Sequence, residues 1–164
     1  MKLLTKLSLL TAITVLSFSC TPESMDVKVD DLIVNVEVQE SKSIEMEILE
    51  LINNHRLSIG LNPLQSMTII KSTAFTHTDY MVDTQTVSHA NFFTRSNYLK
   101  NNTGAKHVSE NVAYGFTSAK SVVGAWMRSE AHKKNIEGDY TNFEVSAEKG
   151  ADDKWYFTNI FIKK

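Results

Sequence analysis

Apolar side chains recur every three or four residues in three stretches of this chain, the spacing that places them on one face of a helix. The first stretch begins at Ser43, an expected N-cap, and ends before Gly60 and Pro63. The second covers residues 66–83. The third follows Ser118, and "SEAHKKNI" then forms a short helix that ends at Gly138. The predicted apolar faces contain Ile44, Ile48, Leu51, Ile52, Ile69, Ile70, Ala74, Met81, Val122, Val123, Trp126 and Met127.

The spacing of apolar residues changes to every second position near the C-terminus. The segments "TNFEVSAEKG" and "KWYFTNIFIKK", joined by the turn "ADD", predict a terminal β-hairpin. A further strand is expected around residues 108–114. Helices followed by a strand and a hairpin predict an α+β fold, with helices packed on an antiparallel sheet.

The first 19 residues have the pattern of an export signal. Lys2 and Lys6 precede an apolar stretch over residues 7–18, which is too short to cross a bilayer as a helix. Cys20 follows directly and is the only cysteine, so it has no disulfide partner within the chain. This position predicts a lipoprotein whose acyl chains hold it stably on a membrane. The alternative is an unpaired thiol in a discarded peptide.

The predicted organisation is therefore a signal peptide (1–19), a tether (20–42) and one folded domain (43–164). Alternating valines and isoleucines within the tether also suit one added edge strand. The full chain has 17 basic and 19 acidic side chains, and removal of Lys2 and Lys6 leaves 15 against 19, a net charge of −4. This acidic balance and the lack of a long basic run argue against nucleic acid as a partner.

Three residues carry candidate chemistry. His89 lies in "VSHANFF", Glu110 in "SENVAYG" and His132 in "WMRSEAHKKNI". Two neutral imidazoles and a carboxylate can ligate a divalent metal or form an acid/base cluster. Neither alternative is excluded by the residues alone.

The runs "NNHRLSIGLNPL", "AFTHTDYM", "SHANFFTR" and "SENVAYGFTSAKSVVGAWMRSEAHKKNI" resemble, in this order, the bacterial branch of the CAP superfamily, also called SCP-like domains. The resemblance covers residues 45–162. It implies an α-β-α sandwich whose cleft carries two histidines and two acidic residues, which in several members hold a zinc-like cation. His89, Glu110 and His132 match three of these four positions.

The fourth position of the family pattern differs in this chain. Ser129 stands where eukaryotic members have a glutamate, and Glu130 lies next to it. Glu130 either turns into the cleft or supplies a favourable negative charge at the start of the short helix, which is the expected role. Asn159 and Glu144 also depart from the pattern, on strands expected to line the site.

Other polar and aromatic residues have simpler interpretations. His77 is expected to be a core or cleft-wall histidine satisfied by one hydrogen bond. His55 and His107 are expected on the surface, and Arg56 and Arg95 as bridges between loops. Lys133 and Lys134 are expected to form a solvated face. The predicted core aromatics are Phe92, Phe93, Trp126 and Trp155.

Three functional classes compete. The first is a binding module of the bacterial cell envelope, whose cleft takes a divalent cation or a small apolar ligand. The second is a metal-dependent hydrolase that uses His89, Glu110 and His132 to activate water. The third is a structural lipoprotein. A serine nucleophile is disfavoured, because Ser88 and His89 are adjacent and point to opposite faces of an extended backbone. We expect the binding module, with an unknown ligand or protein partner and no assigned catalytic residue.

Overall fold

The computed structural model of the protein describes residues 41–164. Within this range the elements are α1 (Ser43–Ser58), α2 (Thr68–Asp83), α3 (Phe92–Thr103), β1 (His107–Tyr114), α4 (Ala119–Arg128), α5 (Glu130–Ile136), β2 (Asn142–Lys149) and β3 (Trp155–Lys163). The predicted signal peptide, the lipidation site at Cys20 and nearly all of the tether lie outside the described residues. No helix of residues 41–164 has the length and apolarity needed to span a bilayer.

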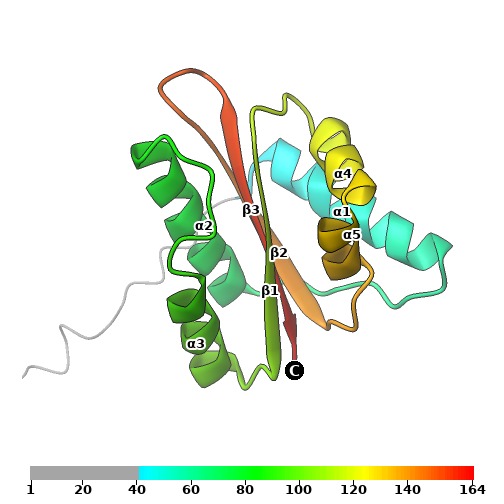
Figure 1. Cartoon of the computed structure of the whole chain (residues 1–164). Helices are drawn as coiled ribbons and strands as arrows, with labels where there is room; N and C mark the ends of the chain where they lie inside the picture. The colour runs from blue at the N-terminus through cyan, green and yellow to red at the C-terminus, as the bar shows by residue number, and fades with distance from the viewer. Residues whose placement is uncertain (1–40) are drawn as a thin grey trace, which may run out of the picture. The chain divides into compact units, whose positions relative to one another are not determined.

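The three strands form one antiparallel sheet in the order β1-β3-β2. Figure 1 shows α2 and α3 on one face of this sheet and α1, α4 and α5 on the other. The α+β class and the three-layer α-β-α arrangement are therefore confirmed.

The central strand β3 supplies both halves of the core, because successive side chains of a strand point to opposite faces. Phe157 and Phe161 pack in the cluster that also contains Trp126 and the apolar faces of α1 and α4. Ile160 and Ile162 pack in the second cluster, with α2 and α3. The apolar stripe of each predicted helix thus faces the sheet.

Most predicted elements are confirmed, and the helix α3 is the one that the sequence analysis missed. This helix buries only Ser96 and Leu99, so it lacks the apolar stripe from which the other helices were predicted. It ends at Gly104, whose φ of 72° is left-handed and favours glycine. At the start of α1 the N-cap is Lys42 and not Ser43 as predicted.

The outer edge of β2 is covered by two helices and a loop. Gln65 pairs with this edge through a backbone bridge to Asn142. Further along, Lys71 Nζ of α2 donates to Val145 O at 2.9 Å, and Glu45 Oε1 of α1 accepts from Ala147 N at 2.8 Å. The buried side chains of Glu45 and Lys71 also pair with each other, at 2.6 Å. This pair joins helices that lie on opposite faces of the sheet.

The outer edge of β1 is engaged in a similar way by the α4–α5 segment. Trp126 Nε1 donates to Val112 O at 3.2 Å, and Asn135 Nδ2 donates to Glu110 O at 3.4 Å. Both carbonyls lie on the edge of β1 that does not pair with β3. The candidate site lies along this edge.

Candidate functional site

Glu110 is the centre of the site and is bonded on both carboxylate oxygens. Its side chain is 1% exposed. Arg95 of α3 donates from Nε to Oε2 at 2.9 Å and from Nη2 to Oε1 at 2.8 Å, and His89 Nδ1 donates to Oε1 at 2.9 Å. Such a two-pronged guanidinium–carboxylate contact is strong and directional. The buried charge of Glu110 is therefore neutralised within the protein.

His89 is held by Glu110 through one ring nitrogen. In the tautomer that donates from Nδ1 to Glu110, Nε2 is the ring nitrogen left to accept a hydrogen bond. The side chain is 52% exposed. Glu110 therefore fixes the orientation of the imidazole. The exposed edge of the ring remains available to a ligand as a hydrogen-bonding group.

His77 is buried next to Glu110. Its Nε2 donates to Ser88 O at 2.8 Å and lies 3.8 Å from Glu110 Oε1, too far for a hydrogen bond. Burial lowers the pKa of His77, although Glu110 opposes the shift. The prediction of a buried histidine satisfied by one hydrogen bond is confirmed. The Ser88 hydroxyl accepts from Ala90 N at 3.3 Å. Neither contact activates Ser88 as a nucleophile.

His132 lies on α5, which asparagines fasten to β1. Asn111 Nδ2 donates to His132 O at 3.1 Å, and Asn135 Nδ2 donates to Asn111 Oδ1 at 2.8 Å. Burial lowers the pKa of His132, and the charge of His89 lowers it further. The two imidazoles are therefore within electrostatic range of each other, but the His132 ring does not join the hydrogen-bonded cluster around Glu110.

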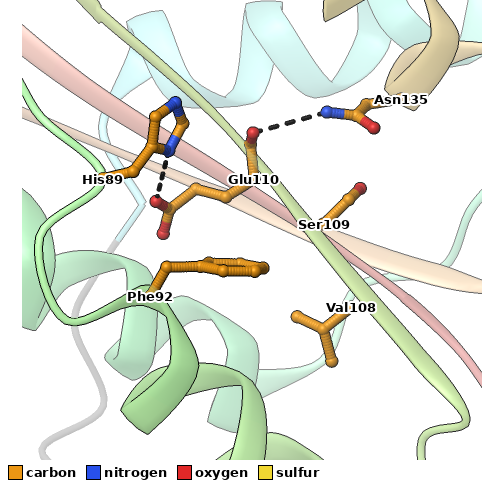
Figure 2. Close-up of a pocket in the computed structure, with 6 residues that line it drawn as sticks. All are labelled: His89, Phe92, Val108, Ser109, Glu110 and Asn135. Carbon is orange, nitrogen blue, oxygen red and sulfur yellow. Dashed lines mark hydrogen bonds and ion pairs between the residues drawn. The ribbon is translucent and has the colours of Figure 1, made fainter. Parts of the chain in front are cut away.

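A pocket of about 300 Å³ opens beside Glu110, between α3, β1 and α5. Figure 2 shows Phe92 and Val108 on one side of Glu110 and Ser109 and Asn135 on the other, with His89 over the carboxylate. The Ser109 hydroxyl is buried without a hydrogen-bond partner among the described residues. The pocket therefore combines an apolar wall with the polar side chains of His89 and Asn135.

The family resemblance implies a cation here, and the arrangement of side chains does not fit one. Across residues 41–164, no group of three or more His, Cys, Asp or Glu side chains is placed to hold a metal ion. The guanidinium of Arg95 already lies against the carboxylate oxygens that a cation would use. The structure thus joins His89 to Glu110, but it does not bring His132 into a common ligand set with them.

The fourth family position gives no replacement for the missing acid. Ser129 is the residue between α4 and α5, where it serves as the C-cap of one helix and the N-cap of the next. Glu130 is exposed in the first turn of α5, as expected for a charge that favours the start of a helix. Neither residue lines the pocket.

The two departures on the strands have different consequences. Asn159 is fully buried opposite Asn111 in the sheet register, next to the contacts that hold α5. Glu144 lies on β2, the far edge of the sheet, and burial raises the pKa of its carboxyl against the opposing effects of Ser66 and Lys71. Only Asn159 is near the site, because β2 does not contribute to it.

Arg95 is a residue of the site whose contact with Glu110 was not predicted from the sequence. Its role depends on α3 turning towards β1, and the missing apolar stripe hid that helix. Arg56, by contrast, bridges loops as predicted, with bonds to the carbonyls of Asn62, Ile136 and Gly138. The prediction for Phe93 was wrong, since its side chain is 83% exposed while Phe92 lines the pocket.

Two proteins of Bacillus subtilis are similar in sequence. The uncharacterised membrane protein YlbC is 31% identical over 126 residues, which are 73% of this chain and 34% of YlbC. The uncharacterised protein YkwD is 33% identical over 95 residues, or 56% of this chain and 37% of YkwD. The chain thus aligns with only about a third of the length of each relative.

Solved structures share the fold. An outer surface protein of Borrelia burgdorferi superposes with a TM-score of 0.67 at 22% identity, covering 76% of this chain and 96% of its own. An extracellular protein of Bacillus anthracis with an SCP domain superposes with a TM-score of 0.61 at 28% identity, covering 73% of this chain and 40% of its own.

The decisive match is to a family model. The model of the cysteine-rich secretory protein family, CAP, covers residues 49–161. This range contains the whole sheet except the last residues of β3, together with His89, Arg95, Glu110 and His132. Cys20, the single cysteine, precedes it. The chain therefore belongs to the CAP family.

Proposed function

We propose that this protein is a binding module of the bacterial cell envelope, and that its pocket takes a small, partly apolar ligand without a resident metal ion. The observation that carries the proposal is the pocket of about 300 Å³ beside a carboxylate already neutralised by Arg95. Pockets that combine an apolar wall with a few fixed polar groups are typical ligand sites.

The polar groups of the pocket define the chemistry of the ligand. His89, which is 52% exposed, presents its second ring nitrogen, and Asn135 lines the pocket with a side-chain amide that has both donor and acceptor atoms. Phe92 and Val108 supply apolar contact. A planar group that carries both a donor and an acceptor, such as an amide, matches these features. The hydrolase alternative has less support, because Glu110 would have to accept a proton or bind a metal with oxygens that Arg95 and His89 already occupy.

Benzamide is a suitable probe, since it combines an aromatic ring with an amide. We expect it to bind saturably and to shift the backbone amide resonances of residues 108–110 and 135 in two-dimensional NMR spectra of the full chain. Phe92→Ala should weaken binding at least several-fold, because it removes the apolar wall. Phe93→Ala is the matched control: this neighbouring phenylalanine is exposed and does not line the pocket. Equal binding to all three proteins would refute the proposed pocket.

The proposed location rests on the N-terminal sequence and on the relatives. The pattern of residues 1–20 is that of an exported lipoprotein. A membrane protein of Bacillus subtilis, an outer surface protein of Borrelia burgdorferi and an extracellular protein of Bacillus anthracis are among the similar proteins. We place the CAP domain outside the cytoplasmic membrane, held there by lipid on Cys20.

Cys20→Ala tests the anchor directly. Wild-type protein is expected in the membrane fraction of bacteria that express it, because several acyl chains together hold a protein stably on a bilayer. The variant should move to the soluble fraction or remain as uncleaved precursor. Ser17→Ala, which keeps the cysteine, is the control. If the variant stays on the membrane at its mature size, the lipid anchor is not at Cys20.

A further inference from the structure

A second pocket, of about 480 Å³, lies at the C-terminal end of α5 and is rich in lysine. It is formed where the start of β1, the end of β3 and the turn after α5 come together. Its lining residues are Lys106, His107, Lys134, Asn135, Gly138, Asp139, Tyr140 and Lys163. None of the chemistry assigned to the first pocket uses these lysines.

The pocket carries an excess of positive charge. Lys163 pairs with Asp139 at 2.6 Å, and this contact is the main reason that the pKa of Asp139 is lowered. Lys106 and Lys134 form no ion pair with any carboxylate of residues 41–164. With three lysines against one aspartate, the local charge is +2 before His107 is counted. The whole chain has a net charge of −2, so this excess is a local feature.

Neighbouring contacts keep the lysines free and fix the pocket. Glu137, the residue that follows α5, is paired with His55 at 2.8 Å and lies 3.7 Å from Lys133, and it forms no ion pair with Lys134. The buried Arg56 holds the carbonyls of Ile136 and Gly138 at 2.7 and 2.9 Å, which fixes the turn. Lys106 N donates to Lys163 O at 2.7 Å, which fixes the opposite wall.

The two pockets share one residue. Asn135 lines both, and its amide is held by Asn111 Oδ1. The apolar pocket and the basic pocket are therefore neighbours that meet at Asn135. One ligand can occupy both if its apolar part and its charged part lie at opposite ends.

We propose that the lysine pocket binds a phosphate group, and that this group belongs to the same ligand whose apolar part enters the first pocket. Lysine ammonium groups act as point charges for phosphate, and a concave site of one sign concentrates the opposite charge. The ligand class is thus a small amphipathic phosphate ester. The shared-ligand part of the inference rests on the proposed function, whereas phosphate binding by the lysines does not.

Pyrophosphate is the first probe, titrated calorimetrically into the full chain at low ionic strength. We expect saturable binding that falls at least tenfold in Lys106→Gln/Lys134→Gln. The control variant Lys120→Gln/Lys133→Gln removes the same charge from residues that do not line the pocket, and it should change affinity less than twofold. Equal weakening in both variants, or no saturable binding to wild type, would overturn the lysine site.

Phenethyl phosphate, which joins an aromatic ring to a phosphate, tests the shared ligand. It should bind at least tenfold more tightly than inorganic phosphate, and Phe92→Ala should remove that gain while leaving pyrophosphate affinity unchanged. A lack of gain over inorganic phosphate would overturn the shared-ligand proposal. Benzamide binding without any phosphate binding would refute the lysine site and leave the proposed function standing. Pyrophosphate binding without benzamide binding would do the reverse.

Discussion

Trp126→Ala is expected to destabilise the domain by about 3–5 kcal/mol. Trp126 is only 2% exposed and lies in the larger core cluster, where α4 packs against the sheet. Its loss leaves a cavity and also removes the hydrogen bond from Nε1 to Val112 O at 3.2 Å. Single domains of this size are stable by about 5–15 kcal/mol, so the loss is a large share of the total. Chemical denaturation followed by circular dichroism measures it.

Two control variants separate the contributions of Trp126. Trp126→Phe keeps most of the apolar volume and loses the N–H donor, so it should cost less than half as much as the alanine variant. Trp155→Ala removes the second tryptophan, which is only half-buried next to the hairpin turn, and should also cost less. A free energy of unfolding for Trp126→Ala within about 1 kcal/mol of wild type would contradict the packing described for α4.

Arg95→Ala is expected to raise the affinity of the protein for zinc. The substitution frees the Glu110 oxygens next to His89 Nδ1, at the place that the guanidinium now occupies. We expect the dissociation constant for zinc to fall at least tenfold at pH 7.5, measured by isothermal titration. Without zinc the variant should be less stable by about 3–5 kcal/mol, because the buried charge of Glu110 loses its partner. Added zinc should restore part of that loss.

The zinc response has a matched control and a dependence on His89. Arg128→Ala removes an exposed arginine at the end of α4 and should leave zinc affinity unchanged. Arg95→Ala/His89→Ala should lose the gain, since one ligand is missing. If the alanine variant does not fold, Arg95→Gln serves in its place, because it keeps a hydrogen-bond donor without the charge. Tight zinc binding by wild type, unchanged in a folded Arg95 variant, would show that the guanidinium does not exclude the cation.

The sequence predicted the parts of the fold that carry a periodic apolar signal. The helices over 43–58, 68–83 and 119–128 bury residues such as Ile48, Ile70 and Val122, and the hairpin alternates as expected. The helix α3 has no such signal, since it covers the sheet with Ser96 and Leu99 alone. Phe92 and Phe93 begin this helix, and adjacent helical residues point in different directions. Without the helix, nothing indicated which phenylalanine lines the pocket.

The sequence motifs predicted which residues belong to the candidate site, but not which of them contact each other. His89 and Glu110 were found from their motifs, and they are bonded at 2.9 Å. The partner that decides the chemistry of Glu110 is Arg95, fifteen residues earlier in the chain and on a different element. The separation of His132 from that cluster is likewise set by how α5 packs on β1 through Asn111 and Asn135. Contacts of this kind depend on tertiary packing, which local sequence patterns do not encode.

The covered edges of the sheet have a consequence for how copies of the domain meet. A bare edge strand offers a row of N–H and C=O groups onto which another chain can add, the usual route to strand-paired aggregates. Here Lys71 and Glu45 occupy backbone groups of β2, and Trp126 and Asn135 occupy carbonyls of β1. At high protein concentration, one copy of the domain therefore meets these side chains on the edge strands of another copy, and not a row of free backbone groups onto which a strand could add. Because Lys71 and Glu45 come from different helices, resistance to aggregation lasts as long as both α1 and α2 remain docked.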